Sequence, residues 1–207
     1  MALGFSVQRK SFYSCAYALK LSEGDILTEY YFDVETSGTN FEKEEIITIQ
    51  WQRLGFSGEP IGKLNILKSW ESSEKRILSE FLPNLRCYHW DFVFVGKNLL
   101  FDFNMLNQRM KYHNLGDIDI RCLSERVILD IKPLLVLVNG GRFIGYDKTM
   151  PKSNPIKNEE IPNLYREKNF PKIIQYIVDE TKDFTNVFQF LKKEMPKLKE
   201  QLISCSP

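Results

Sequence analysis

The chain has 207 residues, enough for one domain with a full hydrophobic core, and carries 28 Lys and Arg against 27 Asp and Glu. A net charge of +1 argues against a protein that coats nucleic acid through basic charge alone, and 43% hydrophobic residues argue against a disordered chain. No apolar run reaches the roughly 18 residues of a membrane span, and the four scattered cysteines favour neither disulfides nor zinc. The N-terminus shows no signal-peptide pattern, so we expect a cytoplasmic protein without membrane contact.

The first third of the chain predicts three strands joined by short polar connections, as in an antiparallel meander. Residues 1–26 form an N-terminal extension whose pattern fits either a strand or a helix. In the second strand, Ile47, Ile49 and Trp51 alternate with polar residues and should share one face. The expected strands cover 26–34, 45–54 and 64–67.

The rest of the chain predicts helices around a buried strand. The Asn139-Gly140 pair either closes a hairpin or ends a helix in the left-handed conformation. The polar stretch 139–169 is expected to be a long loop or insertion. Expected strands cover 92–95 and 127–131. The expected helices are one that Ser72 or Ser73 caps and that ends near Pro83, one over 101–111, and one from 171 to 191 or beyond. The order of elements indicates a single α/β domain with a mixed sheet.

Two acids at the end of the first strand are the first candidate site. Asp33 and Glu35 stand at positions i and i+2, so both side chains point to the same face of the strand. Two carboxylates without a counter-charge repel one another, and Mg²⁺ or Mn²⁺, which prefer oxygen ligands, would relieve this repulsion. The alternative is a solvated strand end with two ordinary acids.

Asp102 is the second candidate. It lies in the first turns of the helix that follows the buried strand 92–95, and ligands of α/β sheets gather at such places. Asp102 is therefore placed to meet the first two acids. Its alternative role is that of a first-turn acid that complements the helix dipole.

The last helix carries a tyrosine and two acids beside its apolar stripe. Tyr176, Glu180 and Asp183 follow one flank of the helix at i, i+4 and i+7. They border the buried face and could reach a site on the sheet. A charged shoulder of an ordinary surface helix is the alternative.

The first two of these elements resemble motifs of the DEDD superfamily of 3′–5′ exonucleases, which includes the proofreading domains of DNA polymerases. The first motif of that family has the form Asp-x-Glu-Thr after an apolar strand, and this chain has Asp33-Val-Glu35-Thr36. The second has the form Asn-x-x-x-Asp, which Asn98 and Asp102 match. The two motifs occur in the family's order.

The third motif resembles that of the tyrosine-type branch, though imperfectly. In that branch a Tyr-x-x-x-Asp pattern lies on the last helix, whereas here Glu180 takes the place of the Asp after Tyr176. Asp183 has the usual side chain but lies one turn later, so either acid can be the fourth ligand. The histidines of the chain, His89 and His113, do not favour the histidine-type branch.

The resemblance implies a ribonuclease H-like fold, in which an antiparallel meander and parallel strands form a mixed sheet flanked by helices. It also implies a metal-dependent 3′–5′ exonuclease that hydrolyses phosphodiester bonds from the 3′ end of single-stranded DNA or RNA. A degenerate protein of the same fold, which binds nucleic acid without cleaving it, is the alternative function.

Roles for single residues also follow from the resemblance. Two divalent cations, Mg²⁺ or Mn²⁺, would be held by the four acids, with Asp33 between them. Thr36 would contact the terminal nucleotide, and Asn98 either binds near the scissile phosphate or shapes its loop. The expected catalytic residues are Asp33, Glu35, Asp102, Tyr176 and either Glu180 or Asp183.

Overall fold

A computed structural model of the chain describes residues 28–86, 91–118, 127–142, 144, 152–153 and 155–204. The expected N-terminal extension, residues 1–26, lies outside the described residues.

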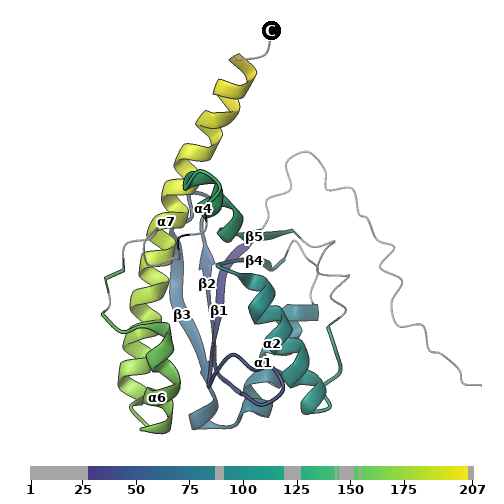
Figure 1. Ribbon diagram of the computed structural model, residues 1–207. Coiled ribbons are helices and arrows are strands. Elements are labelled where there is room, and N and C mark those ends of the chain that lie inside the picture. The colour runs from purple at the N-terminus through teal and green to yellow at the C-terminus, as the bar shows by residue number, and fades with distance from the viewer. Residues whose placement is uncertain are drawn as a thin grey trace, which may run out of the picture.

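A five-stranded mixed sheet forms the centre of the molecule, with the strand order β3-β2-β1-β4-β5 (Figure 1). The first three strands are antiparallel neighbours, whereas β4 and β5 run parallel to β1. This arrangement confirms the predicted ribonuclease H-like sheet. The strands are β1 (Glu29–Thr36), β2 (Ile46–Leu54), β3 (Pro60–Lys68), β4 (Val93–Gly96) and β5 (Ile128–Asp130).

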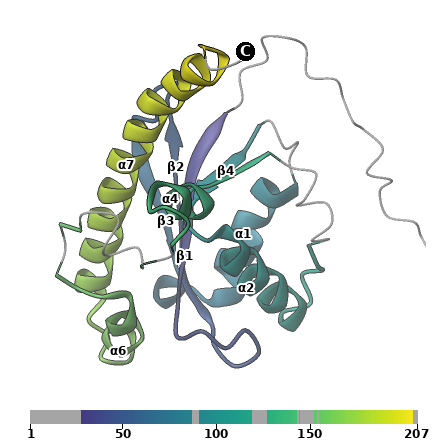
Figure 2. The same ribbon diagram turned by 45° about the horizontal axis from the view of Figure 1, so that its top comes forward.

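Helices cover both faces of the sheet. In Figures 1 and 2, α1 and α2 lie on one face, and the long α7 lies on the other with the short α6 beside it. The last helix continues beyond 191, which the sequence had left open, and its C-terminal part projects past the sheet (Figure 1). The helices are α1 (Glu74–Arg86), α2 (Leu99–Tyr112), α4 (Lys132–Val138), α6 (Ile161–Arg166) and α7 (Phe170–Ser204), with 3-10 turns at Ser69–Glu71 and Asn158–Glu160. None of the helices described is both long and apolar enough to cross a membrane.

The α1/α2 face of the sheet holds an aromatic core. Phe32 of β1 lies against Phe94 of β4, with ring centroids 5.0 Å apart, and against Phe81 of α1 at 5.2 Å. Phe103 of α2 packs on Phe94 at 5.1 Å. Burial of these large rings anchors both helices to the centre of the sheet.

Two smaller clusters lie on the α7 face. One joins Tyr31 and Val95 of the sheet to Phe184 and Phe188 of α7, and it also includes Leu135 of α4. The other gathers around Tyr176 of α7 and includes apolar residues of α6. These clusters fix α7 across the strands on which the candidate acids lie.

The prediction that Ile47 shares one face of the strand with Ile49 is wrong. Thr36 pairs with Ile46 while Glu35 pairs with Thr48, so Ile47 is an extra residue in a β-bulge. An extra residue reverses the alternation of side chains. Ile47 therefore packs in the Tyr176 cluster on the α7 face, whereas Ile49 lies in the core on the α1/α2 face.

The Asn139-Gly140 pair ends a helix, so the hairpin alternative is wrong. Asn139 follows α4, and Gly140 adopts a left-handed φ of 64°. The backbone N–H groups of Gly140 and Gly141 donate to carbonyl groups of the last turn of α4. This is the ordinary termination of a helix by glycine.

The expectation of a long loop is wrong for residues 158–166, which form a 3-10 turn and α6. Two apolar residues three positions apart explain this, because Ile161 and Leu164 lie on one side of α6 and are buried against Ile173 and Tyr176. The polar composition of the segment hid this short amphipathic pattern.

Candidate metal centre

The candidate site lies where β1 loses its parallel neighbour. The pairing of β4 with β1 ends at Tyr31, two residues before Asp33. The backbone beyond β4 then turns away into α2, whose first turn comes near the second half of β1. Strand ends of this kind leave room for ligands in α/β sheets.

A glycine permits this close approach. A Cβ atom at Gly96 would lie 2.7 Å from the backbone oxygen of Phe32 on β1, closer than real side chains come. Two residues later, Asn98 adopts a left-handed φ of 65°, and α2 begins at Leu99. The turn from β4 to α2 therefore packs directly on the strand that carries the acids.

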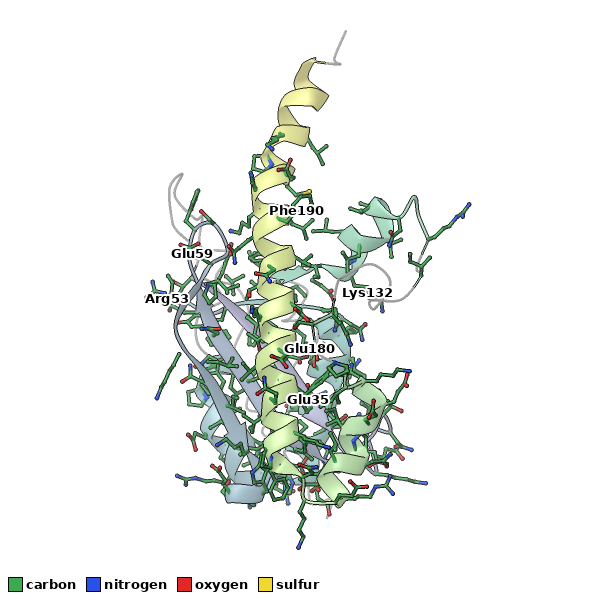
Figure 3. The ribbon with its side chains drawn as sticks, turned by 90° about the vertical axis from the view of Figure 1, so that its left-hand side faces the viewer. Glu35, Arg53, Glu59, Lys132, Glu180 and Phe190 are labelled. Carbon is green, nitrogen blue, oxygen red and sulfur yellow. The ribbon has the colours of Figure 1, made fainter. Side chains whose placement is uncertain are left out.

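Three carboxylates meet on the α7 side of the sheet. Asp33, Glu35 and Glu180 each offer an oxygen atom, and these oxygens lie within 4.8 Å of one another. Figure 3 shows Glu180 on α7 beside Glu35 of the strand behind it. The side chain of Glu35 is 7% exposed, so this group is largely shielded from water.

Asp183 does not join this group. Its carboxylate accepts hydrogen bonds from the backbone N–H and the hydroxyl of Ser153, at 2.7 and 3.1 Å. Three residues further along a helix correspond to about 4.5 Å along its axis, which carries Asp183 past the other acids. The geometry therefore favours Glu180 over Asp183 as the late acid.

Asp102 approaches the group from α2. It lies in the first turn of that helix and is 3% exposed. Burial raises the pKa of Asp102, and the charge of Asp33 raises it further. An acid that only complemented the helix dipole would remain in water, so the burial of Asp102 sets it apart from that role.

The positive charge near the acids is too small to keep all of them ionised. Burial, followed by the charge of Glu180, raises the pKa of Asp33 from 3.8 to about 7. Burial and the charge of Asp33 also raise the pKa of Glu35 well above its ordinary value. The protein has placed groups together that cannot all be ionised at neutral pH without a further cation.

Lys97 is a member of the site that the sequence analysis missed. It follows the last residue of β4, and its Nζ lies 2.5 Å from Oε1 of Glu180. Burial lowers the pKa of Lys97, but the carboxylates of Glu180 and Asp33 outweigh burial, and the net shift is upward. Lys97 directly precedes Asn98 of the second motif, and this position was the feature of the sequence that could have indicated it.

Gln50 was also missed. Its side-chain amide donates to Oδ2 of Asp33 at 3.0 Å and, more weakly, to Oε1 of Glu35 at 3.4 Å. The hydroxyl of Thr48 donates to the amide oxygen of Gln50, which fixes the orientation of the amide. Since Gln50 and Thr48 pair with Asp33 and Glu35 across the antiparallel strands, the polar side of the β2 alternation was the signal.

Tyr176 of α7 lies near the acids. The side chain is 1% exposed, and its hydroxyl donates to the side-chain oxygen of Asn158. Burial, then the charges of Glu35 and Glu180, raises the pKa of Tyr176, so the hydroxyl keeps its proton. Asn158 belongs to the segment that was expected to be a loop.

The two predicted substrate-binding residues make local contacts. The hydroxyl of Thr36 donates to the backbone oxygen of Gly38 at 2.6 Å. The backbone N–H of Asn98 donates to Asp130, while its side-chain oxygen accepts from Nζ of Lys132 at 2.7 Å. Asn98 thus shapes the turn before α2.

The residues of the cluster fit a divalent cation. All the donors are carboxylate oxygens, which suit Mg²⁺ and Mn²⁺. Oε2 of Glu180 is buried and has no hydrogen-bond partner among the described residues. A buried carboxylate oxygen without a partner is costly, and a metal ion would satisfy it.

Structures of exonuclease I share the fold of this chain. One aligns with a TM-score of 0.53 and 13% identity, covering 86% of this chain and 43% of its own. The complex of E. coli exonuclease I with a dT13 oligonucleotide gives 0.52 and 13%, covering 86% and 43%. A product-bound exonuclease I structure gives 0.54 and 12%, covering 86% and 46%.

At such identities the likeness shows the fold alone, which is the ribonuclease H-like α/β fold. The chain spans less than half the length of these exonuclease I chains. Its sequence matches no protein-family model and no curated protein.

Proposed function

We propose that the protein is a metal-dependent 3′–5′ exonuclease that hydrolyses phosphodiester bonds at the 3′ end of single-stranded nucleic acid. The observation that carries this proposal is the meeting of Asp33, Glu35 and Glu180 within 4.8 Å, with Asp102 buried beside them. These residues come from the three motifs that resemble those of DEDD exonucleases. The exonuclease I-like fold supports the same reaction class.

The acids would hold two divalent cations, Mg²⁺ or Mn²⁺. Asp33, Glu35 and Glu180 would hold one, and Asp33 with Asp102 would hold the other. When bound, the pair lowers the pKa of the attacking water and stabilises charge on the attacking and leaving oxygens. Gln50 keeps the Asp33 carboxylate in place through its 3.0 Å hydrogen bond.

Tyr176 would orient the attacking water. Its hydroxyl lies in the field of Glu35 and Glu180 and remains protonated, so it can donate a hydrogen bond. In the structure this hydrogen bond goes to Asn158, which holds the ring in place. A water that enters between Tyr176 and Glu180 would take over that donor.

The proposed substrate is the 3′ end of single-stranded DNA or RNA. E. coli exonuclease I forms a complex with a dT13 oligonucleotide, which makes single-stranded DNA the first substrate to test. Thr36 and Asn98, which flank the acids on β1 and before α2, would contact the terminal nucleotide and the scissile phosphate.

Digestion of end-labelled oligonucleotides tests the proposal. Single-stranded DNA and RNA, labelled at either end, are incubated with Mn²⁺ or Mg²⁺ and either the wild-type protein or Asp33→Ala. We expect stepwise shortening from the 3′ end that the substitution abolishes. Asp179→Ala is a matched control, because this half-buried acid lies on the same α7 but is bonded to Gln175 and does not belong to the carboxylate cluster.

A protein that binds nucleic acid without cleaving it is the second candidate. The ammonium of Lys97 favours it, because a lysine already supplies positive charge to Glu180. Binding of labelled oligonucleotide at low salt, with no shortening in either metal, would replace the first proposal by this one.

A further inference from the structure

The buried ion pair between Lys97 and Glu180 occupies part of the carboxylate cluster. The side chains of Lys97 and Glu180 are 15% and 11% exposed, so the pair is largely removed from water. Oε1 of Glu180 carries the ammonium, whereas Oε2 has no partner among the described residues. A carboxylate oxygen of the same glutamate lies within 4.8 Å of carboxylate oxygens of Asp33 and Glu35, close enough for one metal ion to bind all three.

A metal ion and this ammonium would compete for the same negative charge. A divalent cation bound to Asp33, Glu35 and Glu180 would lie within a few ångströms of Nζ of Lys97. Two positive charges at such a distance repel one another, and the repulsion is stronger in a buried site than in water. The cluster therefore accommodates the ammonium or the metal ion at Glu180, but not both in these positions.

The backbone on both sides of Lys97 is held by hydrogen bonds, so displacement of its ammonium requires a movement of the side chain and not of the backbone. The carbonyl of Gly96 accepts a hydrogen bond from the N–H of Ile131 at 3.0 Å. The N–H of Asn98 donates to the carboxylate of Asp130 at 2.9 Å. Lysine has a flexible four-carbon stem, which can swing away from Glu180 without unfolding the turn.

We propose that Lys97 neutralises Glu180 in the metal-free protein and that a divalent cation binds the cluster by displacing the ammonium from Glu180. This inference rests on the proposed function, because it takes the carboxylate cluster to be a metal site. It makes Lys97 a residue that sets the affinity for the metal.

A second ion pair of the same kind provides the control. Nζ of Lys192 on α7 lies 2.6 Å from Oε1 of Glu29 on β1, with side chains 27% and 12% exposed. Oε2 of Glu29 is likewise buried without a partner among the described residues. In the described part of the chain, however, Glu29 belongs to no group of acids that could hold a metal.

Titration of the full chain with Mn²⁺ alone, with the heat of binding measured by calorimetry, tests the inference. We expect Lys97→Met to bind Mn²⁺ about tenfold more tightly or better, because no ammonium has to be displaced. Lys192→Met should bind Mn²⁺ as the wild type does. Without metal, Lys97→Met should melt at a lower temperature than the wild type, and Mn²⁺ should raise its melting temperature by more.

Unchanged or weaker Mn²⁺ binding in Lys97→Met would overturn the inference, as would an equal gain in Lys192→Met. If Lys97→Met does not fold, the comparison of Asp102→Asn with Asp102→Asn/Lys97→Met measures the same competition with one buried negative charge fewer. If Lys97→Met binds Mn²⁺ more tightly but the wild type does not hydrolyse nucleic acid, the proposed function is wrong and this inference stands. If the wild type hydrolyses nucleic acid but Lys97→Met binds Mn²⁺ with unaltered affinity, the proposed function stands and this inference is wrong.

Discussion

Two buried groups of charges lie on opposite faces of the sheet, and only one of them is satisfied. On the α1/α2 face, the carboxylate of Glu74 accepts two hydrogen bonds from Arg109, at 2.8 and 2.7 Å, and one from the backbone of Ile46. His113 completes the set at 2.6 Å. On the α7 face, four acids share Lys97, and one oxygen of Glu180 has no partner among the described residues.

The pKa shifts of the two groups have opposite signs. Burial raises the pKa of Glu74, but the hydrogen bonds from Arg109, Ile46 and His113 outweigh it, and the net pKa is lowered. Burial and like charges raise the pKa of Asp33 to about 7. A buried charge that has all its hydrogen-bond partners contributes to the stability of the fold. A buried group of acids with too few partners is instead a candidate site for a ligand.

The largest expected effect is on activity. Replacing Asp33 and Glu35 together by Ala should lower hydrolysis of a 3′-labelled oligonucleotide by about 10³-fold or more, because the ligands that hold the metal are lost. The circular dichroism spectrum and the thermal transition should remain those of a folded protein, because the removal of two buried carboxylates that repel one another offsets the loss of the hydrogen bonds from Gln50. Activity surviving in pure double variant would contradict the assignment of the site.

Glu74→Gln should have the opposite profile. We expect a loss of about 3–5 kcal/mol in the free energy of unfolding, measured with urea, because Arg109 loses its buried partner. Any protein that remains folded should still hydrolyse nucleic acid. Glu80→Gln, at the exposed pair with Arg76, should cost less than about 1 kcal/mol. Equal losses in the two variants would show that Glu74 is no structural anchor.

The stability of the metal-free protein should fall between about pH 4 and pH 7. The pKa of Asp33 is raised by folding from 3.8 to about 7, so its protonated form stabilises the fold at low pH, and this contribution is lost as the pH rises through about 7. Asp33→Asn should reduce the decline by about 1–3 kcal/mol. Urea denaturation in EDTA measures the effect, and identical declines would contradict it.

The smallest expected effect separates two acids of α7. Asp183→Ala should change hydrolysis by less than about threefold and stability by about 0.5 kcal/mol, since only the contact with Ser153 is lost. Glu180→Ala should lower hydrolysis by about 10²-fold or more. The reverse ranking would make Asp183 the fourth ligand.

Local pattern was sufficient to predict the strands and the shared side of Asp33 and Glu35 on β1. Alternation along β1 placed Asp33 and Glu35 on one side, and their position at the end of a buried strand followed from composition alone. The meander and the helix that carries Asp102 also followed from periodicity. These predictions depend on neighbours in sequence, which is why they succeeded.

The remainder depends on contacts between distant residues. Lys97 meets Glu180 across 83 positions of the chain, and the choice between Glu180 and Asp183 depends on where α7 lies against the sheet. The bulge that turns Ile47 over arises from the register of two strands. No periodicity of a single segment contains this information.

The absence of a side chain at Gly96 also limits how the protein can change. Because the oxygen of Phe32 fills the space where a Cβ atom would be, even alanine would push the turn before α2 away from β1. Lys97 lies in this turn, and Asp102 lies in the first turn of the helix that follows it. In a saturation-mutagenesis library selected for catalysis, position 96 should therefore tolerate as few substitutions as the acids themselves, although it contributes no chemical group to the reaction.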